Sequence, residues 1–339
     1  MKHHLKLSIF LFIGILAAGC GGKNETLISG KTMGTTYHVK VVTGTFQDIG
    51  DLREQIEKTL EAINQSMSTY RKDSEISQFN TLRSTEEKFQ VSKDFLEVMR
   101  VAEKLHQLTN GAWDGTINPL IRVWGFRGSE VQQSIPKAEA IQEVLAEIGF
   151  DQIEISDGHL RKKKASVSLD LASIAKGYGV DQVAAVIGKN GFRDFLVEIG
   201  GEVCASGFRK DGKPWKIGIS TPRKDASLHE VYKALDLTTH KAFATSGDYR
   251  NFFELNGKRY SHILDPTTGY PLANGVVSAS VMADTCTFAD GLATALMVLG
   301  HEKGIPLVNS LERVECLIVV QAADGTFRDY ASEGFDKGS

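Results

Sequence analysis

Cysteine is scarce in this chain, and its scarcity excludes two common ways of stabilising a fold. The 339 residues include four cysteines, and no two of them are spaced as CxxC. Apart from Cys20 in the N-terminal segment, they are Cys204, Cys286 and Cys316. An odd number without metal-ligand spacing argues against a disulfide framework and against a structural zinc site. We therefore expect these three residues to be small, buried and apolar.

A strong excess of either charge is also missing. The 39 Lys and Arg residues and the 42 Asp and Glu residues give a formal net charge of −3. No long-range field therefore attracts nucleic acid or an anionic membrane, and we expect no nucleic-acid partner. The only local basic cluster, residues 161–164, follows a turn signal at Asp157-Gly158, and we expect a solvated hairpin there.

No hydrophobic run at the N-terminus is long enough to span a membrane. Residues 5–18 are apolar but are interrupted by Lys6 and Ser8. They are also fewer than the ~20 residues that a spanning helix needs. A polar, basic segment at residues 1–4 precedes the run, so residues 1–19 are predicted to be a signal peptide.

The end of this segment, Leu16-Ala17-Ala18-Gly19-Cys20, resembles a bacterial lipobox. In that interpretation Cys20 receives a diacylglycerol, and residues 20–26 form a flexible lipidated tether. The mature chain would then stand on the outer face of a bacterial membrane. The alternative is an ordinary secretory signal with a chance cysteine.

Internal repeats and low-complexity linkers are not found in the rest of the chain. With 42% hydrophobic and 24% charged residues, the composition is that of a globular protein with one large domain or two packed ones. Apolar spacing predicts helices at 49–64, 92–108, 136–148, 174–187, 285–299 and 304–311. Strand-like runs occur at 27–42, 153–155, 166–169, 195–199, 202–205, 215–219, 232–237, 242–245, 260–264, 276–281 and 315–320. Antiparallel hairpins with helices on one face predict the fold class α+β.

The first candidate site is the segment from Asp170 to Tyr178. A predicted strand ends at Asp170 and a helix begins within two or three residues. Free backbone N–H groups and the positive end of the helix dipole would make an anion site there. Lys176 would lie one turn into the helix, where a phosphate can reach it. In the alternative interpretation Asp170 is only an N-cap and Lys176 faces solvent.

A second candidate is the pair Asp290 and Thr294. Their i, i+4 spacing places a carboxylate and a hydroxyl on one helix face, and both are oxygen ligands suited to Mg²⁺. Asp290 lies in an otherwise apolar run, where an unpaired carboxylate would be costly to bury. A metal or a structural ion pair is therefore expected. Asp284, just before the helix, is expected to be its N-cap.

Two further groups of residues are suited to binding or catalysis. His262 ends a predicted strand before a tight turn at residues 265–269, so it is a candidate general base; the alternative is a structural histidine. The polar residues 245–250 are candidates to hydrogen-bond the same ligand. Tyr70 and Trp113, next to tight turns, are candidates to stack on a planar ring, whereas core packing explains Trp124 and Phe126 equally well.

The order of these segments along the chain resembles the ApbE family. The matching pieces are Met33-Gly34-Thr35, Tyr70 with Asp73-Ser74-Glu75 and Phe79-Asn80, Gly111-Ala112-Trp113-Asp114, residues 170–177, Gly200-Gly201-Glu202, residues 245–249, residues 262–266, and Asp290 with Thr294. The resemblance runs from about Leu27 to Tyr330. It implies a T-fold-like α+β architecture over residues 27–339, rich in antiparallel sheet and with flanking helices.

The resemblance also implies an activity, that of an FAD:protein FMN transferase. In such enzymes a threonine hydroxyl of an acceptor protein attacks the FMN phosphorus of FAD in a Mg²⁺-dependent reaction, and AMP leaves. The implied acceptors are subunits of sodium-pumping NADH:quinone oxidoreductase or related membrane redox complexes. We accordingly expect a lipid-anchored chain on the periplasmic face, at the inner rather than the outer membrane. The residue after the predicted lipidated cysteine is Gly21, whereas the residue usually linked to inner-membrane retention at that position is Asp.

Carried over residue by residue, the resemblance implies a role for each candidate. Asp290, Thr294 and a backbone carbonyl near Ser173 would hold the metal, and His262 would be the base. The residues that would contact FAD are Met33, Tyr70, Ala112, Trp113, Asp114, Asp170, Lys176 and Ile263.

Three departures and two alternative functions stay open at this point. Ala293 stands where some family members have a second carboxylate, which leaves the number and affinity of metal ions open, and Trp113 stands where Phe is commoner. Residues 290–294 resemble a sequence that such enzymes modify, but they lie in a predicted helix, so we do not expect self-modification. The alternative functions are an FAD pyrophosphatase, which releases FMN and AMP, and a flavin-binding lipoprotein without turnover.

Overall fold

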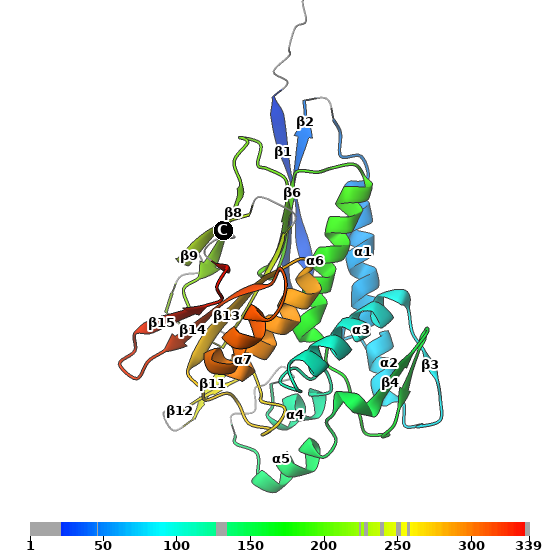
Figure 1. Ribbon diagram of the computed structural model, residues 1–339. Coiled ribbons are helices and arrows are strands. Elements are labelled where there is room, and N and C mark those ends of the chain that lie inside the picture. Colours follow the sequence, from blue (N-terminus) through cyan, green and yellow to red (C-terminus); the bar gives the residue numbers. More distant parts are fainter. Residues whose placement is uncertain are drawn as a thin grey trace, which may run out of the picture.

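The computed structural model describes residues 22–45, 47–126, 134–223, 225–226, 230–237, 241–248, 252–255 and 258–335. Its centre is an eight-stranded sheet with the strand order β1-β2-β6-β7-β10-β13-β14-β15, in which all neighbours pair antiparallel (Figure 1). These strands are β1 (Lys23–Thr32), β2 (Thr35–Gly44), β6 (Phe195–Ile199), β7 (Glu202–Ser206), β10 (Lys241–Gly247), β13 (Val276–Ala283), β14 (Glu315–Gln321) and β15 (Phe327–Ala331).

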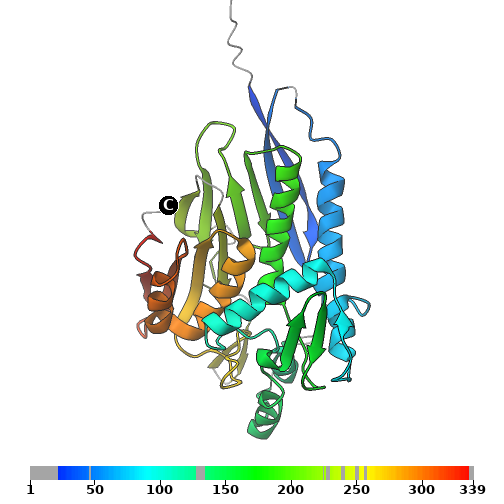
Figure 2. The same cartoon turned by 45° about the vertical axis from the view of Figure 1, so that its right-hand side comes forward.

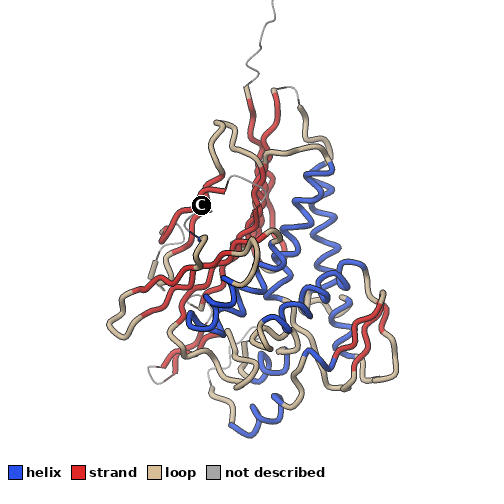
Figure 3. The backbone as a smooth tube through the Cα atoms, viewed as in Figure 1, coloured by secondary structure: helices blue, strands red, loops and turns tan. Residues whose placement is uncertain are grey.

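Smaller sheets and the helices surround this sheet (Figure 3). The small sheets are formed by β3 (Phe89–Gln90), β5 (His159–Lys162) and β4 (Ile153–Ser156), by β8 (Trp215–Ser220) and β9 (Val231–Leu237), and by β11 (Phe252–Leu255) and β12 (Lys258–Ser261). The helices are α1 (Leu52–Met67), α2 (Glu75–Thr81), α3 (Lys93–Leu108), α4 (Asn118–Val123), α5 (Ala138–Leu145), α6 (Ala172–Lys189) and α7 (Cys286–Asn309), with a 3-10 turn at Phe150–Gln152.

Different elements cover the two faces of the large sheet. Helices α6 and α7 lie side by side on one face with α1 and α3 against them, and the β8–β9 hairpin covers part of the other face (Figure 2). Along β7, Cys204 packs in the cluster under α6, whereas Val203 and Ala205 pack in the cluster under β8–β9. Every residue of β13 is buried. Because the strands pair antiparallel and helices cover one face of the large sheet, the observed fold confirms the predicted α+β class with flanking helices.

The first strand prediction, a single kinked strand over residues 27–42, is wrong. Met33 (φ 48°) and Gly34 (φ 73°) form a two-residue turn between β1 and β2. Positive φ at both central residues is the requirement of a type I′ hairpin turn, so the chain reverses where a kink was expected. The tether prediction is also wrong for Lys23–Thr26, because β1 begins at Lys23 and these residues pair with β2.

Several local signals in the sequence are confirmed. The Ser92 side chain accepts a hydrogen bond from Phe95 N (3.2 Å) at the start of α3, as an N-cap should. Helix α7 is broken at Gly300 (φ 70°, ψ 178°), which lies between the two helices predicted there. Cys204, Cys286 and Cys316 are all buried, as expected.

The predicted N-cap of α7 is wrong. Thr285 occupies that position, and Asp284 pairs instead with Lys241 (3.3 Å). The capping carboxylate comes from the neighbouring helix α6, where Asp181 accepts hydrogen bonds from Cys286 N (2.8 Å) and Thr287 N (2.8 Å). A local signal therefore could not identify it.

The basic hairpin is confirmed as a hairpin but not as a wholly solvated one. Strands β4 and β5 pair on either side of Asp157-Gly158. Lys162, however, is fully buried; its Nζ donates to Leu82 O (2.9 Å) and lies 4.8 Å from the centre of the Phe79 ring. This burial lowers the pKa of Lys162 to about 8. The predicted strand at 166–169 is irregular backbone that leads into α6.

Candidate functional site

The approach to α6 is held by side chains from other elements. Asn80 forms two hydrogen bonds with the backbone of Leu169, one to the carbonyl (2.8 Å) and one from the N–H (2.6 Å). Asp170 N donates to Gly115 O (2.8 Å), and Asp170 Oδ1 accepts from Ala172 N (2.9 Å). Leu171 is the N-cap residue of α6, and Asp170 just before it ties the start of the helix to the loop after α3.

The expected cradle of free N–H groups is only partly present. Besides Ala172 N, the N–H groups of Ile174 and Ala175 donate to Leu171 O (3.1 and 2.9 Å). These three N–H groups are therefore not free, although the sequence predicts free donors at the start of this helix. The positive end of the α6 dipole remains, so positive charge for an anion must come largely from a side chain.

That side chain is Lys176, which lies between two buried carboxylates. Its Nζ is 3.4 Å from Glu202 Oε1, 3.7 Å from Asp290 Oδ1 and 3.3 Å from Ala172 O. The side chains of Glu202 and Asp290 are each 4% exposed, and that of Lys176 is 26% exposed. The solvent-facing alternative for Lys176 is therefore wrong.

The charges in this cluster influence one another strongly. Burial disfavours the Lys176 ammonium, but the Asp290 and Glu202 carboxylates outweigh burial and hold the pKa of Lys176 above its usual value. Burial raises the pKa of both Asp290 and Glu202, and the Lys176 ammonium offsets part of each shift. Two acids thus share one base, which leaves the cluster short of positive charge.

Asp290 and Thr294 lie on α7 as the sequence predicts. Asp290 Oδ2 accepts from Gly177 N (2.9 Å), and Thr294 Oγ1 lies 2.9 Å from Ser246 Oγ of β10. Ser173, in the first turn of α6, accepts a hydrogen bond from Trp113 Nε1 (3.1 Å). Carboxylate and hydroxyl oxygens are therefore present on the two adjacent helices.

These residues fit a magnesium ion. Among the described residues, no group of three or more His, Cys, Asp or Glu side chains is placed to hold a metal. Mg²⁺ instead uses one or two carboxylates and keeps several waters. Glu202 Oε2 is buried without a hydrogen-bond partner in the described structure, so the cluster has unused acceptor capacity.

Two helices can approach this closely because Gly177 has no side chain. A Cβ at Gly177 would lie 2.3 Å from Cys286 O and 2.8 Å from Asp290 Cβ. Ordinary contacts do not reach such distances, so the α6–α7 spacing depends on this glycine. The spacing in turn brings Asp290 to Lys176.

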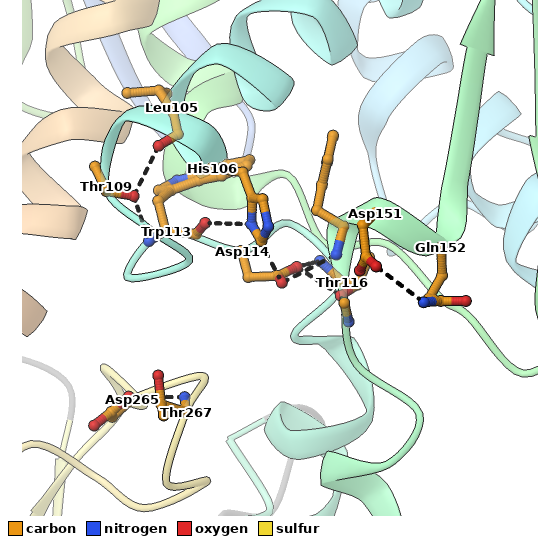
Figure 4. A network of polar contacts seen from close by, with 12 residues as sticks. Leu105, His106, Thr109, Trp113, Asp114, Thr116, Asp151, Gln152, Asp265 and Thr267 are labelled. Carbon is orange, nitrogen blue, oxygen red and sulfur yellow. Dashed lines mark hydrogen bonds and ion pairs between the residues drawn. The ribbon is translucent and has the colours of Figure 1, made fainter.

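Asp114 organises the loop after α3 (Figure 4). Its Oδ1 accepts from Thr116 N (2.7 Å) and Thr116 Oγ1 (2.6 Å), and its Oδ2 accepts from Phe150 N (3.1 Å). His106 Nδ1 lies 3.5 Å from Oδ2. Burial raises the pKa of Asp114, although the Thr116 hydrogen bonds and His106 oppose the shift. The carboxylate is therefore committed to internal contacts.

The two aromatic stacking candidates differ in accessibility. Trp113 is 2% exposed and packs against Phe150 at 6.0 Å between ring centres, so a stacking role for its ring is wrong. Tyr70 is 83% exposed and remains available to a planar ligand. Trp124 is a core residue, in line with the packing interpretation.

A groove of about 610 Å³ lies beside the β1–β2 turn. The Met33 side chain reaches α6 at Gly179, where an added Cβ would lie 2.9 Å from Met33 Cε. Gly200 lies against both Thr35 and the aliphatic part of Lys176. A Cβ added at Gly200 would be 2.9 Å from Thr35 Cγ2 and 3.3 Å from Lys176 Cδ. The groove is therefore next to the charged cluster; its lining residues are Lys31, Thr32, Met33, Gly34, Thr35, Thr36, Glu61, Asn64 and Arg71.

His262 directly follows β12, the position expected from the sequence, and is partly buried. Ile263 is buried in the same core cluster as Ile174 of α6 and Ala293 of α7. Its N–H donates to Ser261 Oγ (3.1 Å). This packing ties the His262 segment to both helices of the site.

Some predicted residues belong together in space and others do not share these contacts. Lys176 pairs with Asp290, and Trp113 donates a hydrogen bond to Ser173. Ala112 is buried beside Trp113, and Tyr70 is on the outside, next to the groove residue Arg71. Cys20 lies outside the described residues.

Sequence reasoning missed two charged residues. Glu202 was part of a matching segment but had no role, and Asp181 was not considered. A buried charge inside an apolar stretch was the signal that identified Asp290. The same signal was available for Asp181, which follows Gly179-Val180 in α6, and for Glu202, which precedes Val203-Cys204-Ala205.

Comparisons with known proteins give a consistent result. The sequence matches the ApbE family over residues 33–318. It is 43% identical to an FAD:protein FMN transferase of Vibrio cholerae over 95% of each chain, and 37% identical to one of Haemophilus influenzae over 99% of this chain and 98% of the relative.

Solved structures resemble the fold equally well. The flavin transferase ApbE from Vibrio cholerae superposes with a TM-score of 0.84 at 41% identity, covering 93% of this chain and 99% of that one. The apo form of the Pseudomonas stutzeri flavinyl transferase ApbE gives a TM-score of 0.83 at 35% identity, covering 94% and 98%.

Proposed function

The chain belongs to the ApbE family, and from that premise we propose that it moves the FMN half of FAD onto a threonine hydroxyl of an acceptor protein, using Mg²⁺ and releasing AMP. The chain is an enzyme, an FAD:protein FMN transferase with FAD as substrate. The metal, the threonine and the second product are the parts that we add to this identity.

The observation that carries the proposal is the Lys176–Glu202–Asp290 cluster at the start of α6. A diphosphate bears negative charge that must be neutralised before an alcohol can attack it. Asp290, Thr294 and a carbonyl near Ser173 would hold Mg²⁺, which when bound would neutralise part of this charge. Lys176 would donate to a phosphate oxygen, and the α6 dipole adds to the favourable field.

His262 supplies the base in this proposal. The threonine oxygen forms a bond to the FMN phosphorus, its proton passes to His262, and the bond to the AMP phosphate breaks with its electron pair on AMP. The adjacent Ile263 is anchored in the core with residues of both helices, which restricts where the imidazole can lie. Burial of the site limits access of water, which would otherwise compete with threonine.

The experiment that tests the function is mass spectrometry of a threonine-containing acceptor domain incubated with the purified chain, FAD and Mg²⁺. A mass gain equal to FMN less water, lost when EDTA is present, is the expected result. Free FMN and AMP without that gain would identify the pyrophosphatase instead. Intact bound FAD would identify a binding protein.

Two variants test the residue roles in the same assay. Asp290→Ala should abolish Mg²⁺-dependent turnover, whereas Asp284→Ala, which removes an exposed carboxylate just before the same helix, should not. His262→Ala should slow transfer by about 100-fold or more, with a much smaller change in FAD affinity. Full activity of either site variant would remove its assigned role.

We also propose a location and an acceptor. The motif ending in Cys20 supports a lipid anchor on the periplasmic face, with the inner membrane as the site because redox complexes of the expected kind lie there. The acceptor would be a subunit of a sodium-pumping NADH:quinone oxidoreductase or a related complex. Within the described residues, no helix is long and apolar enough to cross a membrane. Labelling with a radioactive fatty acid should depend on Cys20 and be lost in Cys20→Ser.

A further inference from the structure

Lys176 has two carboxylate neighbours, and only one of them has an assigned role. Asp290 is a proposed metal ligand, and Glu202 comes from β7 on the other side of the ammonium. The Ala172, Glu202 and Asp290 oxygens around Nζ lie at 3.3–3.7 Å, which is longer than a close ammonium–carboxylate hydrogen bond of about 2.7–2.9 Å. The ammonium is therefore shared loosely between the two acids.

A metal ion on Asp290 would change this arrangement. The ammonium lies 3.7 Å from Asp290 Oδ1, so a cation bound to that carboxylate would repel it at short range in a buried site. With Asp290 as its only partner, Lys176 would be driven out of the site when the metal bound. Glu202 gives Lys176 a separate counter-ion, so both cations can be present together.

The second oxygen of Glu202 has its own use. Glu202 Oε2 is buried and accepts no hydrogen bond within the described structure. A buried acceptor left unsatisfied costs about 1–3 kcal/mol, so its retention calls for a donor. Mg²⁺ keeps several of its waters when bound to protein carboxylates, and such waters are donors.

The backbone fixes where Glu202 lies. Gly200 (φ 65°) and Gly201 (φ 110°) form the turn between β6 and β7, and Glu202 pairs with Ile199 across it. Gly201 N donates to Glu198 Oε1 (2.7 Å), which closes the turn. Glu202 is therefore presented to the cluster by a paired strand.

Resting on the proposed function, we propose that Glu202 is a positioning residue of the metal site: one oxygen retains Lys176 after the metal takes Asp290, and the other accepts a hydrogen bond from a metal-bound water. It thus brings a second carboxylate to the site from β7. Outer-shell partners of this kind typically contribute 10–100-fold to metal affinity.

The test compares Glu202→Gln with the wild type in the absence of acceptor. Binding of Mg²⁺ to the FAD-loaded chain is measured by calorimetry, and thermal unfolding is followed with and without the metal. Glu202→Gln should weaken metal binding about tenfold or more. Its metal-free melting temperature should not fall, because Lys176 keeps the Asp290 carboxylate as a counter-ion when no metal is bound. Glu198→Gln, which changes a carboxylate in the same hairpin, should bind Mg²⁺ within about twofold of the wild type.

Each other outcome overturns the inference. Metal affinity within twofold of the wild type in Glu202→Gln would remove the role of Glu202 and leave the transferase proposal intact. A lower metal-free melting temperature with unchanged metal affinity would make Glu202 a structural residue only. A wild-type chain that binds no Mg²⁺ would overturn both this inference and the metal in the proposed function, and acceptor labelling would then be measured without metal.

Discussion

Replacing Gly177 by alanine tests whether the close crossing of α6 and α7 is what aligns the metal and phosphate residues. The new methyl group would lie 2.3 Å from Cys286 O, 2.6 Å from Cys286 C and 2.8 Å from Asp290 Cβ. The first two are backbone atoms, so no side-chain rotation relieves the contact. Ordinary contact begins at 3.4 Å, so the helices must separate by roughly 1 Å locally.

The energetic consequence follows from two opposing effects. Overpacking of a well-packed contact costs about 1–3 kcal/mol, and more where backbone must shift. Alanine gains about 1 kcal/mol over glycine from helix propensity. Gly188, in the last turn of the same helix, has open space around its Cβ position. Gly188→Ala should therefore gain helix propensity without any overpacking cost. The overpacking at Gly177 should make the two variants differ by about 3 kcal/mol in free energy of unfolding.

Urea unfolding of both variants measures the difference, and the Mg²⁺-induced rise in melting temperature measures the site. Because Asp290 accepts a hydrogen bond from Gly177 N (2.9 Å), separation of the helices should also weaken metal binding in Gly177→Ala. Gly188→Ala should be at least as stable as the wild type and respond normally to metal. Equal stability and equal metal response of the two variants would refute the idea that this crossing aligns the site.

Two more predictions concern buried charges. Lys162→Met removes an ammonium whose pKa is lowered to about 8 from 10.5; that charge destabilises the folded state below pH 8, and the effect disappears as pH rises to 10.5. The wild type should therefore gain about 3 kcal/mol relative to the variant between pH 8 and 10.5, and a pH-independent difference in urea unfolding would contradict the burial argument. Asp181→Ala removes the carboxylate that caps α7, which should cost about 2 kcal/mol. Asp181→Asn keeps one acceptor oxygen, so its free energy of unfolding should lie between those of the wild type and Asp181→Ala in the same assay. If Asp181→Ala is as stable as the wild type, the cap is dispensable.

Local chemistry explains why much of the fold could be predicted. The Ser92 cap acts through its own helix, and the break at Gly300 needs only a residue that tolerates φ near 70°. The hairpin strands β6 and β7 are short apolar runs joined by Gly200-Gly201. Such signals involve residues within a few positions of one another, so the sequence contains all their partners.

Two of the wrong predictions depend instead on residues from distant parts of the chain. Lys162 lies in a basic run that is typical of solvent, yet Leu82 and Phe79 cover it. Trp113 follows a turn, yet Phe150 buries its ring. In each case the burial of one side chain is decided by a residue from a distant part of the chain, which periodicity does not reveal.

The sequence by itself determined helices α1, α3, α5, α6 and α7, most strands, the α+β class, and the residues Lys176, Asp290 and Thr294 as candidates for phosphate and metal chemistry. Only the tertiary structure decided that Lys176 lies between Asp290 and Glu202, and that Asp181 of α6 caps the neighbouring helix α7. Periodicity and capping act over one or two helical turns, whereas these contacts depend on how closely α6 crosses α7 and on where the β6–β7 turn lies. Gly177 and Gly200 permit that approach because they have no side chain. Only the packed structure shows which neighbours occupy that space: Cys286 and Asp290 at Gly177, and Thr35 and Lys176 at Gly200.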